Sequence, residues 1–81
     1  MRAQWTNRFR RDFRSAPTAI QSAFEKQLEF LIHDVRHPSL RAKKYDEARD
    51  IWQARVTCGW RFYFRIEGDT YQLLTIRAHL K

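Results

Sequence analysis

Two segments near the C-terminal end of the sequence alternate between apolar residues and residues that can bind phosphate. Side chains alternate across a β-strand with a period of two, so each segment, read as a strand, has two different faces. The apolar faces carry Trp60, Phe62, Phe64 and Ile66 in the first segment, and Leu74, Ile76, Ala78 and Leu80 in the second. The opposite faces carry Arg61, Tyr63 and Arg65, followed by Thr75, Arg77 and His79.

The polar faces of these segments hold Arg, Tyr and His, whereas an ordinary solvent-exposed face mixes both signs of charge. Arginine suits the planar, bidentate contact that phosphate offers. Histidine has an unperturbed pKa of about 6.5 and can transfer a proton near neutral pH. We therefore expect this face to bind phosphate, with His79 as the candidate for proton transfer.

The elements before these segments follow from hydrophobic periodicity and from turn residues. Residues 3–6 are expected to form a short edge strand, after which Thr6 or Asn7 can cap a first helix that runs to about Arg14. Ser15 can cap a second helix that runs to about Val35, and Pro38 ends it. Its inner stripe has a spacing of three or four residues and consists of Ile20, Phe24, Leu28, Leu31 and Val35.

The rest of the chain predicts a small sheet. Pro38–Asp50 is polar and basic and is expected to be a loop, followed by strands at Ile51–Val56, Trp60–Ile66 and Tyr71–Ala78. The prediction is one α+β domain over residues 1–81: a short N-terminal strand, a helical hairpin, and a three-strand antiparallel meander with the helices on one sheet face. The other face is expected to be open to solvent or to a ligand.

Composition narrows the classes of partner. The net charge is +7, and twelve of the sixteen basic residues are arginines, which fits nucleic acid or an acidic protein. An anionic membrane fits less well, because the basic residues do not lie opposite a large apolar helix face. No apolar run approaches the ~20 residues of a membrane span, no signal-peptide pattern is evident, and the lone Cys58 fits a reducing compartment. We therefore expect a cytoplasmic protein.

Two other groups of residues are weaker candidates for chemistry. His33 and His37 have a spacing that could suit a metal, but no third ligand is evident, so no metal site is expected. Cys58 lies in a predicted turn without a base partner, so a nucleophilic role is not expected. No cofactor is expected.

Several segments together resemble the RelE/ParE superfamily of toxins, and most of all its RelE- and HigB-type mRNA interferases. The matching segments are His37–Lys44, Ile51–Val56, Trp60–Phe64, Gly68-Asp69 and the last strand with His79. The resemblance implies a RelE-like fold and a type II toxin that cuts mRNA on the ribosome without a metal. The ParE branch shares the fold but acts on DNA gyrase, so a gyrase inhibitor and a non-catalytic RNA- or ribosome-binding module remain alternatives.

The resemblance also implies roles for individual residues. Arg61 matches the middle-strand arginine and is expected to contact the phosphate and its transition state, while His79 matches the terminal-strand histidine that transfers a proton. Lys43 or Lys44 is expected to assist from the loop before the first strand of the meander. Several members of the superfamily carry a tyrosine after the basic residue that ends the last strand, whereas here Leu80 follows His79. Further RNA or phosphate contacts are expected from Arg55, Arg41, Tyr63, Arg65 and Arg77.

The implied partners are a cognate antitoxin, and the ribosome with its mRNA. The antitoxin is expected to carry acidic and apolar residues that cover the basic face or dock along the helices. Oligomers are expected only through the antitoxin complex, and no membrane partner is expected.

Overall fold

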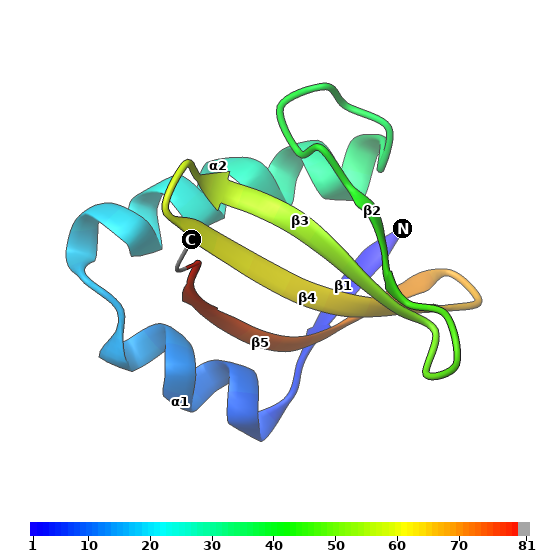
Figure 1. The fold of residues 1–81 in the computed structure, drawn as a ribbon, viewed down its shortest axis with the longest axis horizontal. Helices are drawn as coiled ribbons and strands as arrows, with labels where there is room; N and C mark the ends of the chain where they lie inside the picture. The colour runs from blue at the N-terminus through cyan, green and yellow to red at the C-terminus, as the bar shows by residue number, and fades with distance from the viewer. Residues whose placement is uncertain (80–81) are drawn as a thin grey trace.

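The computed structural model describes residues 1–79 and builds them as two helices packed on one sheet. In chain order the elements are β1 (Arg2–Trp5), α1 (Asn7–Ser15), α2 (Thr18–His33), β2 (Lys43–Asp46), β3 (Ile51–Thr57), β4 (Trp60–Glu67) and β5 (Thr70–Ala78). The strand order is β1-β5-β4-β3-β2 (Figure 1). β1 runs parallel to β5, and the other neighbours are antiparallel.

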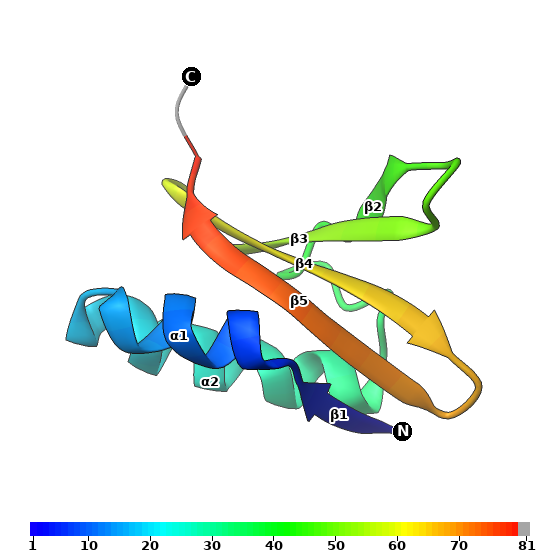
Figure 2. The ribbon, with the colours of Figure 1, turned by 90° about the horizontal axis from the view of Figure 1, so that it is seen from below.

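Both helices lie on one side of β3, β4 and β5, which leaves the other side of these strands uncovered (Figure 2). The predicted α+β class, the helical hairpin and the placement of the helices on one sheet face are therefore confirmed. The uncovered side is called the open face below. It includes Arg61, Tyr63 and Arg65 of β4, as the alternation predicts.

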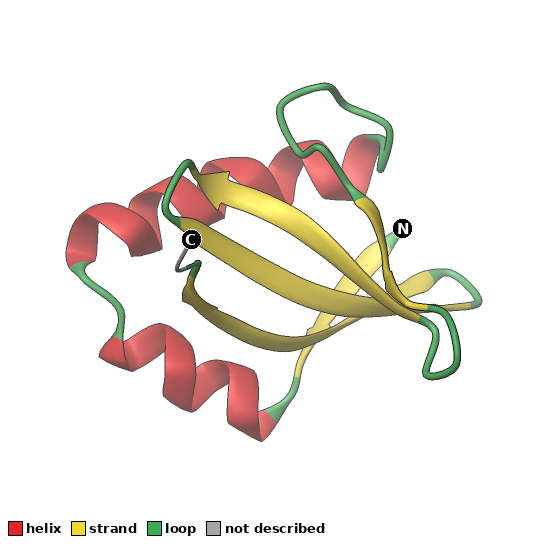
Figure 3. Ribbon diagram, in the orientation of Figure 1, coloured by secondary structure: helices red, strands yellow, loops and turns green. Residues whose placement is uncertain are grey.

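The prediction missed strand β2. Pro38–Asp50 was expected to be a loop, but Lys43–Asp46 pairs antiparallel with the start of β3, beyond a long loop that follows α2 (Figure 3). The segment is Lys-Lys-Tyr-Asp, an edge strand with no apolar alternation to reveal it. Strands at sheet edges are often short and charged, because this prevents pairing with other chains.

The start of α1 agrees with the prediction, whereas the start and the end of α2 differ from it. Thr6 caps α1, since its hydroxyl accepts a hydrogen bond from the backbone N–H of Phe9 at 3.1 Å. Ser15 does not cap α2, because its hydroxyl donates instead to the carbonyl of Arg11 at 3.2 Å. α2 ends at His33, earlier than expected, and the extended Asp34 accepts the backbone N–H of Arg36 in a tight turn.

The core lies between the helices and the inner face of the sheet. Phe62 and Phe64 of β4 are fully buried there, together with Phe24 of α2. Trp5 joins the layers, since its ring meets Phe9, Phe13 and Phe24 edge-to-face at centroid distances of 5.0, 5.0 and 5.6 Å. Burying aromatic rings of this size stabilises a small domain considerably, so the sheet is a firm support for the open face.

A β-bulge changes the predicted faces of β5. Thr75 pairs with Tyr63 and Leu73 pairs with Phe64, which leaves Leu74 as an extra residue between them. Leu73 is therefore the fully buried inner residue, and the placement of Leu74 on the inner face was wrong. Beyond the bulge the predicted alternation holds, while Leu80 lies outside the described residues.

Candidate functional site

Three arginines lie side by side across the open face. Arg55 of β3 is the cross-strand partner of Arg61 of β4, and Arg61 is the partner of Arg77 of β5. Cross-strand partners point to the same side of a sheet, so the three side chains form one row. We call Arg55, Arg61 and Arg77 the arginine row. Like charges on neighbouring strands repel one another, so the row favours a bound anion.

His79 lies at one end of this row. Its backbone N–H donates to the carbonyl of Gly59 at 2.7 Å, which holds the end of β5 beside the turn between β3 and β4. The side chain is exposed. By strand alternation it follows Arg77, so we expect its side chain to lie on the open face beside the arginine row.

The Arg61 guanidinium is anchored at one end. Its Nη1 donates to the carbonyls of Thr57 at 2.6 Å and Trp60 at 3.0 Å, both at the turn between β3 and β4. A guanidinium has five N–H donors, so this anchoring leaves others for a ligand. A held guanidinium loses less conformational entropy on binding than a mobile one, which suits contact with phosphate.

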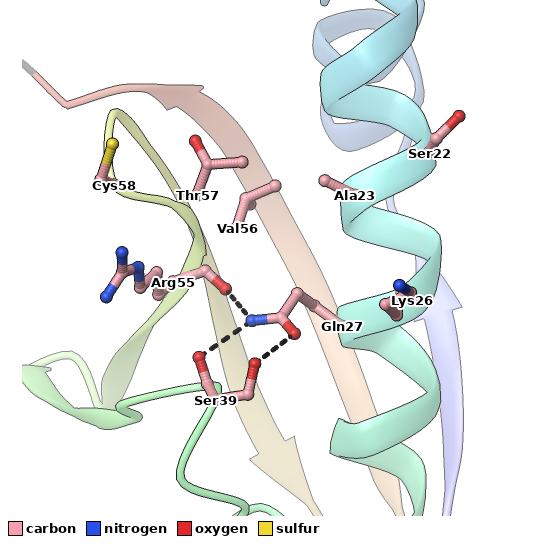
Figure 4. Close-up of a pocket in the computed structure, with 9 residues that line it drawn as sticks. All are labelled: Ser22, Ala23, Lys26, Gln27, Ser39, Arg55, Val56, Thr57 and Cys58. Carbon is pink, nitrogen blue, oxygen red and sulfur yellow. Dashed lines mark hydrogen bonds between the residues drawn. The ribbon is translucent and has the colours of Figure 1, made fainter.

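Arg55 is fixed through its backbone rather than through its side chain. Its N–H donates to the carbonyl of Leu40 at 2.7 Å, and its carbonyl accepts a hydrogen bond from Gln27 Nε2 at 2.8 Å. Gln27 is 5% exposed and also bonds with the backbone and hydroxyl of Ser39 (Figure 4). Figure 4 shows the Arg55 side chain pointing away from Gln27, so this contact sets the position of the strand and leaves the guanidinium free to face a ligand.

A hollow of about 480 Å³ adjoins the row on the open face. We call it the tyrosine hollow, because Tyr45 and Tyr63 meet there at a ring-centroid distance of 4.9 Å. Arg77 covers the Tyr63 ring at 4.7 Å, and hydrogen bonding with the Tyr63 hydroxyl is the main cause that raises the pKa of Arg77. The residues that line the hollow also include Arg8, Arg49, Arg65, Leu74 and Thr75.

The two candidate lysines point to opposite sides of the sheet. Lys43 pairs with Gln53, is exposed and belongs to the open face. Lys44 pairs with Trp52, and its ammonium lies 5.1 Å over the Trp52 ring and 2.7 Å from the carboxylate of Asp50. The hydrogen bond that Lys44 donates to Asp50 is the largest cause that raises the pKa of Lys44, which is the opposite of what a general base needs.

The remaining predicted contacts surround the row and the hollow. Arg65 lines the hollow, and its Nε donates to the carbonyl of Arg49 at 3.0 Å. Tyr63 is only 5% exposed, so little of its ring is available to a ligand. Arg41 is exposed in the loop before β2 and has a left-handed backbone with φ of 47°.

Sequence reasoning missed several residues of this site. Tyr45 and Arg49 lie in the stretch that was expected to be a loop, and Arg8 reaches the hollow from α1. Gln27 gave no signal, because a glutamine in an amphipathic helix is ordinarily exposed. The register of β2 places Tyr45, and the packing of α1 beside β5 places Arg8.

Two negative findings concern the described part of the chain. Among residues 1–79 there is no cluster of three or more His, Cys, Asp or Glu side chains that could hold a metal ion. His37 stacks instead on Phe30 at a centroid distance of 3.8 Å. Neither described helix is long and apolar enough to cross a membrane.

The family model of the ParE toxin of type II toxin–antitoxin systems, parDE, matches residues 3–81. The chain belongs to this toxin family. The toxin is thus a member of the RelE/ParE superfamily, as the sequence resemblance implies. No curated protein matches its sequence.

Solved structures of other toxins share the fold. The YoeB/ParE toxin from Agrobacterium tumefaciens superposes with a TM-score of 0.81 at 15% identity and covers 99% of this chain and 100% of its own. YafQ from E. coli strain BL21(DE3) gives 0.78 at 10% identity over 95% and 91% of the two chains. RelE, in the archaeal RelE–RelB complex from Pyrococcus horikoshii OT3, gives 0.78 at 16% identity over 95% and 92%. At such identities the likeness establishes the fold and not the activity.

Proposed function

We propose that the toxin is an endoribonuclease that cuts mRNA on the ribosome. The observation that supports this most is the arginine row with His79 at its end, on an uncovered sheet face. In this proposal the arginines bind the phosphate and His79 transfers a proton beside them.

The proposed reaction needs no metal. The 2′-oxygen of a ribose attacks the adjacent phosphorus, its proton is lost to solvent, and the bond to the 5′-oxygen breaks to give a 2′,3′-cyclic phosphate. Arg55 and Arg61 hold the phosphate and offset the charge that develops on its oxygens. A guanidinium does not lose its proton in proteins, so neither acts as the base.

The leaving group receives its proton from His79, which acts as general acid on the 5′-oxygen. Lys43 adds positive charge on the same face. Lys44 has no part in this mechanism, because it points to the other side of the sheet and pairs with Asp50. Arg41, Arg65 and Arg77 contact flanking RNA, while Tyr63 supports Arg77 from beneath.

The proposed partners are the ribosome with its mRNA, and an antitoxin. The net charge of +7 favours an acidic antitoxin that covers the open face when the toxin is inactive. Within the solved relatives, RelE is seen with RelB, and YoeB from Staphylococcus aureus with YefM. We propose that this toxin acts in the cytoplasm as one domain that assembles only through its antitoxin.

Expression in cells, followed by mapping of mRNA 5′ ends, tests the proposal. The expected result is a set of new ends with a fixed phase relative to codons in translated regions. A matched Arg61→Ala, His79→Ala double variant should yield none. Growth inhibition that persists in the double variant, with intact mRNA in the wild type, would contradict a catalytic toxin.

A second candidate function is inhibition of DNA gyrase. It is favoured by the matching family model, whose description names the ParE toxin. The same expression experiment separates the two candidates, because a gyrase inhibitor induces the DNA-damage response and leaves mRNA uncut. Supercoiling by purified gyrase in the presence of the toxin gives an independent readout.

A further inference from the structure

The tyrosine hollow has the features of a binding site that lies beyond the proposed point of cleavage. Its volume of about 480 Å³ lies within the range of about 300–1,000 Å³ that is common for small-molecule sites. It opens on the same face as the arginine row, and Arg77 belongs to both. A ligand that extends along the open face from the row would therefore enter the hollow next.

The charge of the hollow selects an anion. Four arginines line it, Arg8, Arg49, Arg65 and Arg77, and none of the described lining residues is acidic. Asp12 and Asp46 offset part of this charge, at 3.7 Å from Arg8 and Arg49 respectively. Asp12 also accepts a hydrogen bond from the hydroxyl of Thr75 in the wall of the hollow at 2.6 Å, which leaves the arginines in excess. Arg65 and Arg77 are held in place by the Arg49 carbonyl and by the Tyr63 ring, so their guanidinium groups are already oriented for a ligand.

The aromatic side of the hollow has one available ring. Tyr63 is 5% exposed, since Tyr45 and Arg77 cover it, whereas Tyr45 is 54% exposed. Tyr45 is one of the two large hydrophobic residues that the structure leaves exposed in residues 1–79. An exposed tyrosine beside phosphate-binding arginines is the arrangement on which single-stranded RNA stacks its bases.

Two β-bulges support the view that the hollow is a built feature. Tyr45 is the extra residue of a bulge between Lys44 and Asp46 in β2, and Leu74 is the extra residue of the bulge in β5. Both line the hollow. Bulges redirect side chains and are common beside functional sites. Without the bulge in β2, Tyr45 would take part in the regular pairing of the strand.

From these observations we propose that the tyrosine hollow binds one nucleotide of single-stranded RNA, with its base stacked on Tyr45 and its phosphate on the surrounding arginines. This nucleotide lies along the strand from the one held by the arginine row. The proposal rests on the proposed function in taking RNA as the substrate, and it adds Tyr45 as a residue that binds the substrate beyond the point of cleavage.

Binding of an uncleavable RNA tests the stacking. The probe is a fluorescent single-stranded RNA of 2′-O-methyl nucleotides, measured by anisotropy with the purified toxin and no ribosome. Tyr45→Ala should weaken binding about tenfold, the size expected for one stacked base, and the control Tyr45→Phe should stay within about twofold of the wild type. Equal affinity for Tyr45→Ala and wild type, or an equal loss in both variants, would overturn the proposal.

A second measurement does not depend on the folding of a variant. In the wild-type toxin, the NMR signals of the Tyr45 ring should shift upfield when the same RNA is added, because a stacked base shields them. Tyr71 is 3% exposed on the inner face, so its ring signals serve as the control and should stay in place. Unchanged Tyr45 signals in saturating RNA would overturn the proposal.

Stacking of RNA on Tyr45 and cleavage of mRNA can be tested independently of each other. The probe cannot be cut, and no ribosome is present, so the binding result does not depend on catalysis. Stacking on Tyr45 by a toxin that leaves ribosomal mRNA intact would contradict the nuclease and retain the site. Ribosome-dependent cleavage without stacking would retain the nuclease and overturn the site.

Discussion

Gln27 of α2 donates a hydrogen bond to the backbone carbonyl of Arg55, 2.8 Å away, and so joins the helical layer directly to the arginine row. The second half of β3 has no pairing with β2, which covers only its first residues. Gln27 and the carbonyl of Leu40 take the place of a neighbouring strand at this edge. The position of Arg55 therefore depends on a helix residue that takes no part in the proposed reaction.

Replacing Gln27 by leucine should destabilise the toxin by about 1–3 kcal/mol, since the carbonyls of Arg55 and Ser39 would lose the donor that Gln27 supplies. Denaturation in urea measures the change. Glu25→Gln on the exposed side of the same helix is the control and should stay within about 0.5 kcal/mol of the wild type. A Gln27→Leu variant as stable as this control would contradict the role assigned to Gln27.

The ion pair of Lys44 predicts a pH dependence. Hydrogen bonding and charge from Asp50 raise the pKa of Lys44 above 10.5 in the folded toxin. A raised pKa means that the pair contributes stability below about pH 10.5 and that this contribution is lost as the pH rises through the folded value. NMR titration should show the pKa of Lys44 falling toward 10.5 in Asp50→Asn. An unchanged pKa in that variant would show that Asp50 is not the cause.

Much of the fold could be predicted from the sequence because most of its elements bury an apolar face. The stripe of α2 and the alternation of Phe62 and Phe64 fix both element type and orientation, since a shift of one residue would expose the whole stripe. Strand β2, which begins with Lys43 and Lys44, could not be predicted. It is an edge strand defined by its pairing with β3, and its sequence has no apolar pattern.

The candidate site was predictable in part for the same reason. The pairing of Arg61 with Arg77 follows from alternation on strands with a clear apolar face, and the same alternation predicts His79 on their side of the sheet. Lys44 could not be assigned to a side of the sheet without β2, and Tyr45 depends on a bulge within that strand. Bulges at Tyr45 and Leu74 interrupt the period of two, so no pattern of alternation reveals the hollow between them.

The salt dependence of RNA binding should reveal the phosphate contact of the arginine row. Each phosphate contact to a single strand contributes about 0.7 to the slope of log affinity against log salt concentration. Arg55→Gln should therefore lower the slope by about that amount, as measured by anisotropy with a 2′-O-methyl RNA. Arg36→Gln, in the loop after α2, is the charge-matched control and should leave the slope unchanged. A similar loss in both variants would mean that only net charge matters.

The most direct test of the central claim is cleavage of mRNA by the purified toxin on ribosomes stalled at a known codon. We expect a cut at that codon by the wild type, with no cut in the absence of ribosomes. His79→Ala should lower the cleavage rate by about 10²–10⁴-fold, the usual contribution of a general acid, while its affinity for uncleavable RNA stays close to that of the wild type. Intact mRNA with the wild type, or cleavage by His79→Ala at the wild-type rate, would contradict the claim that the open face is a ribonuclease site.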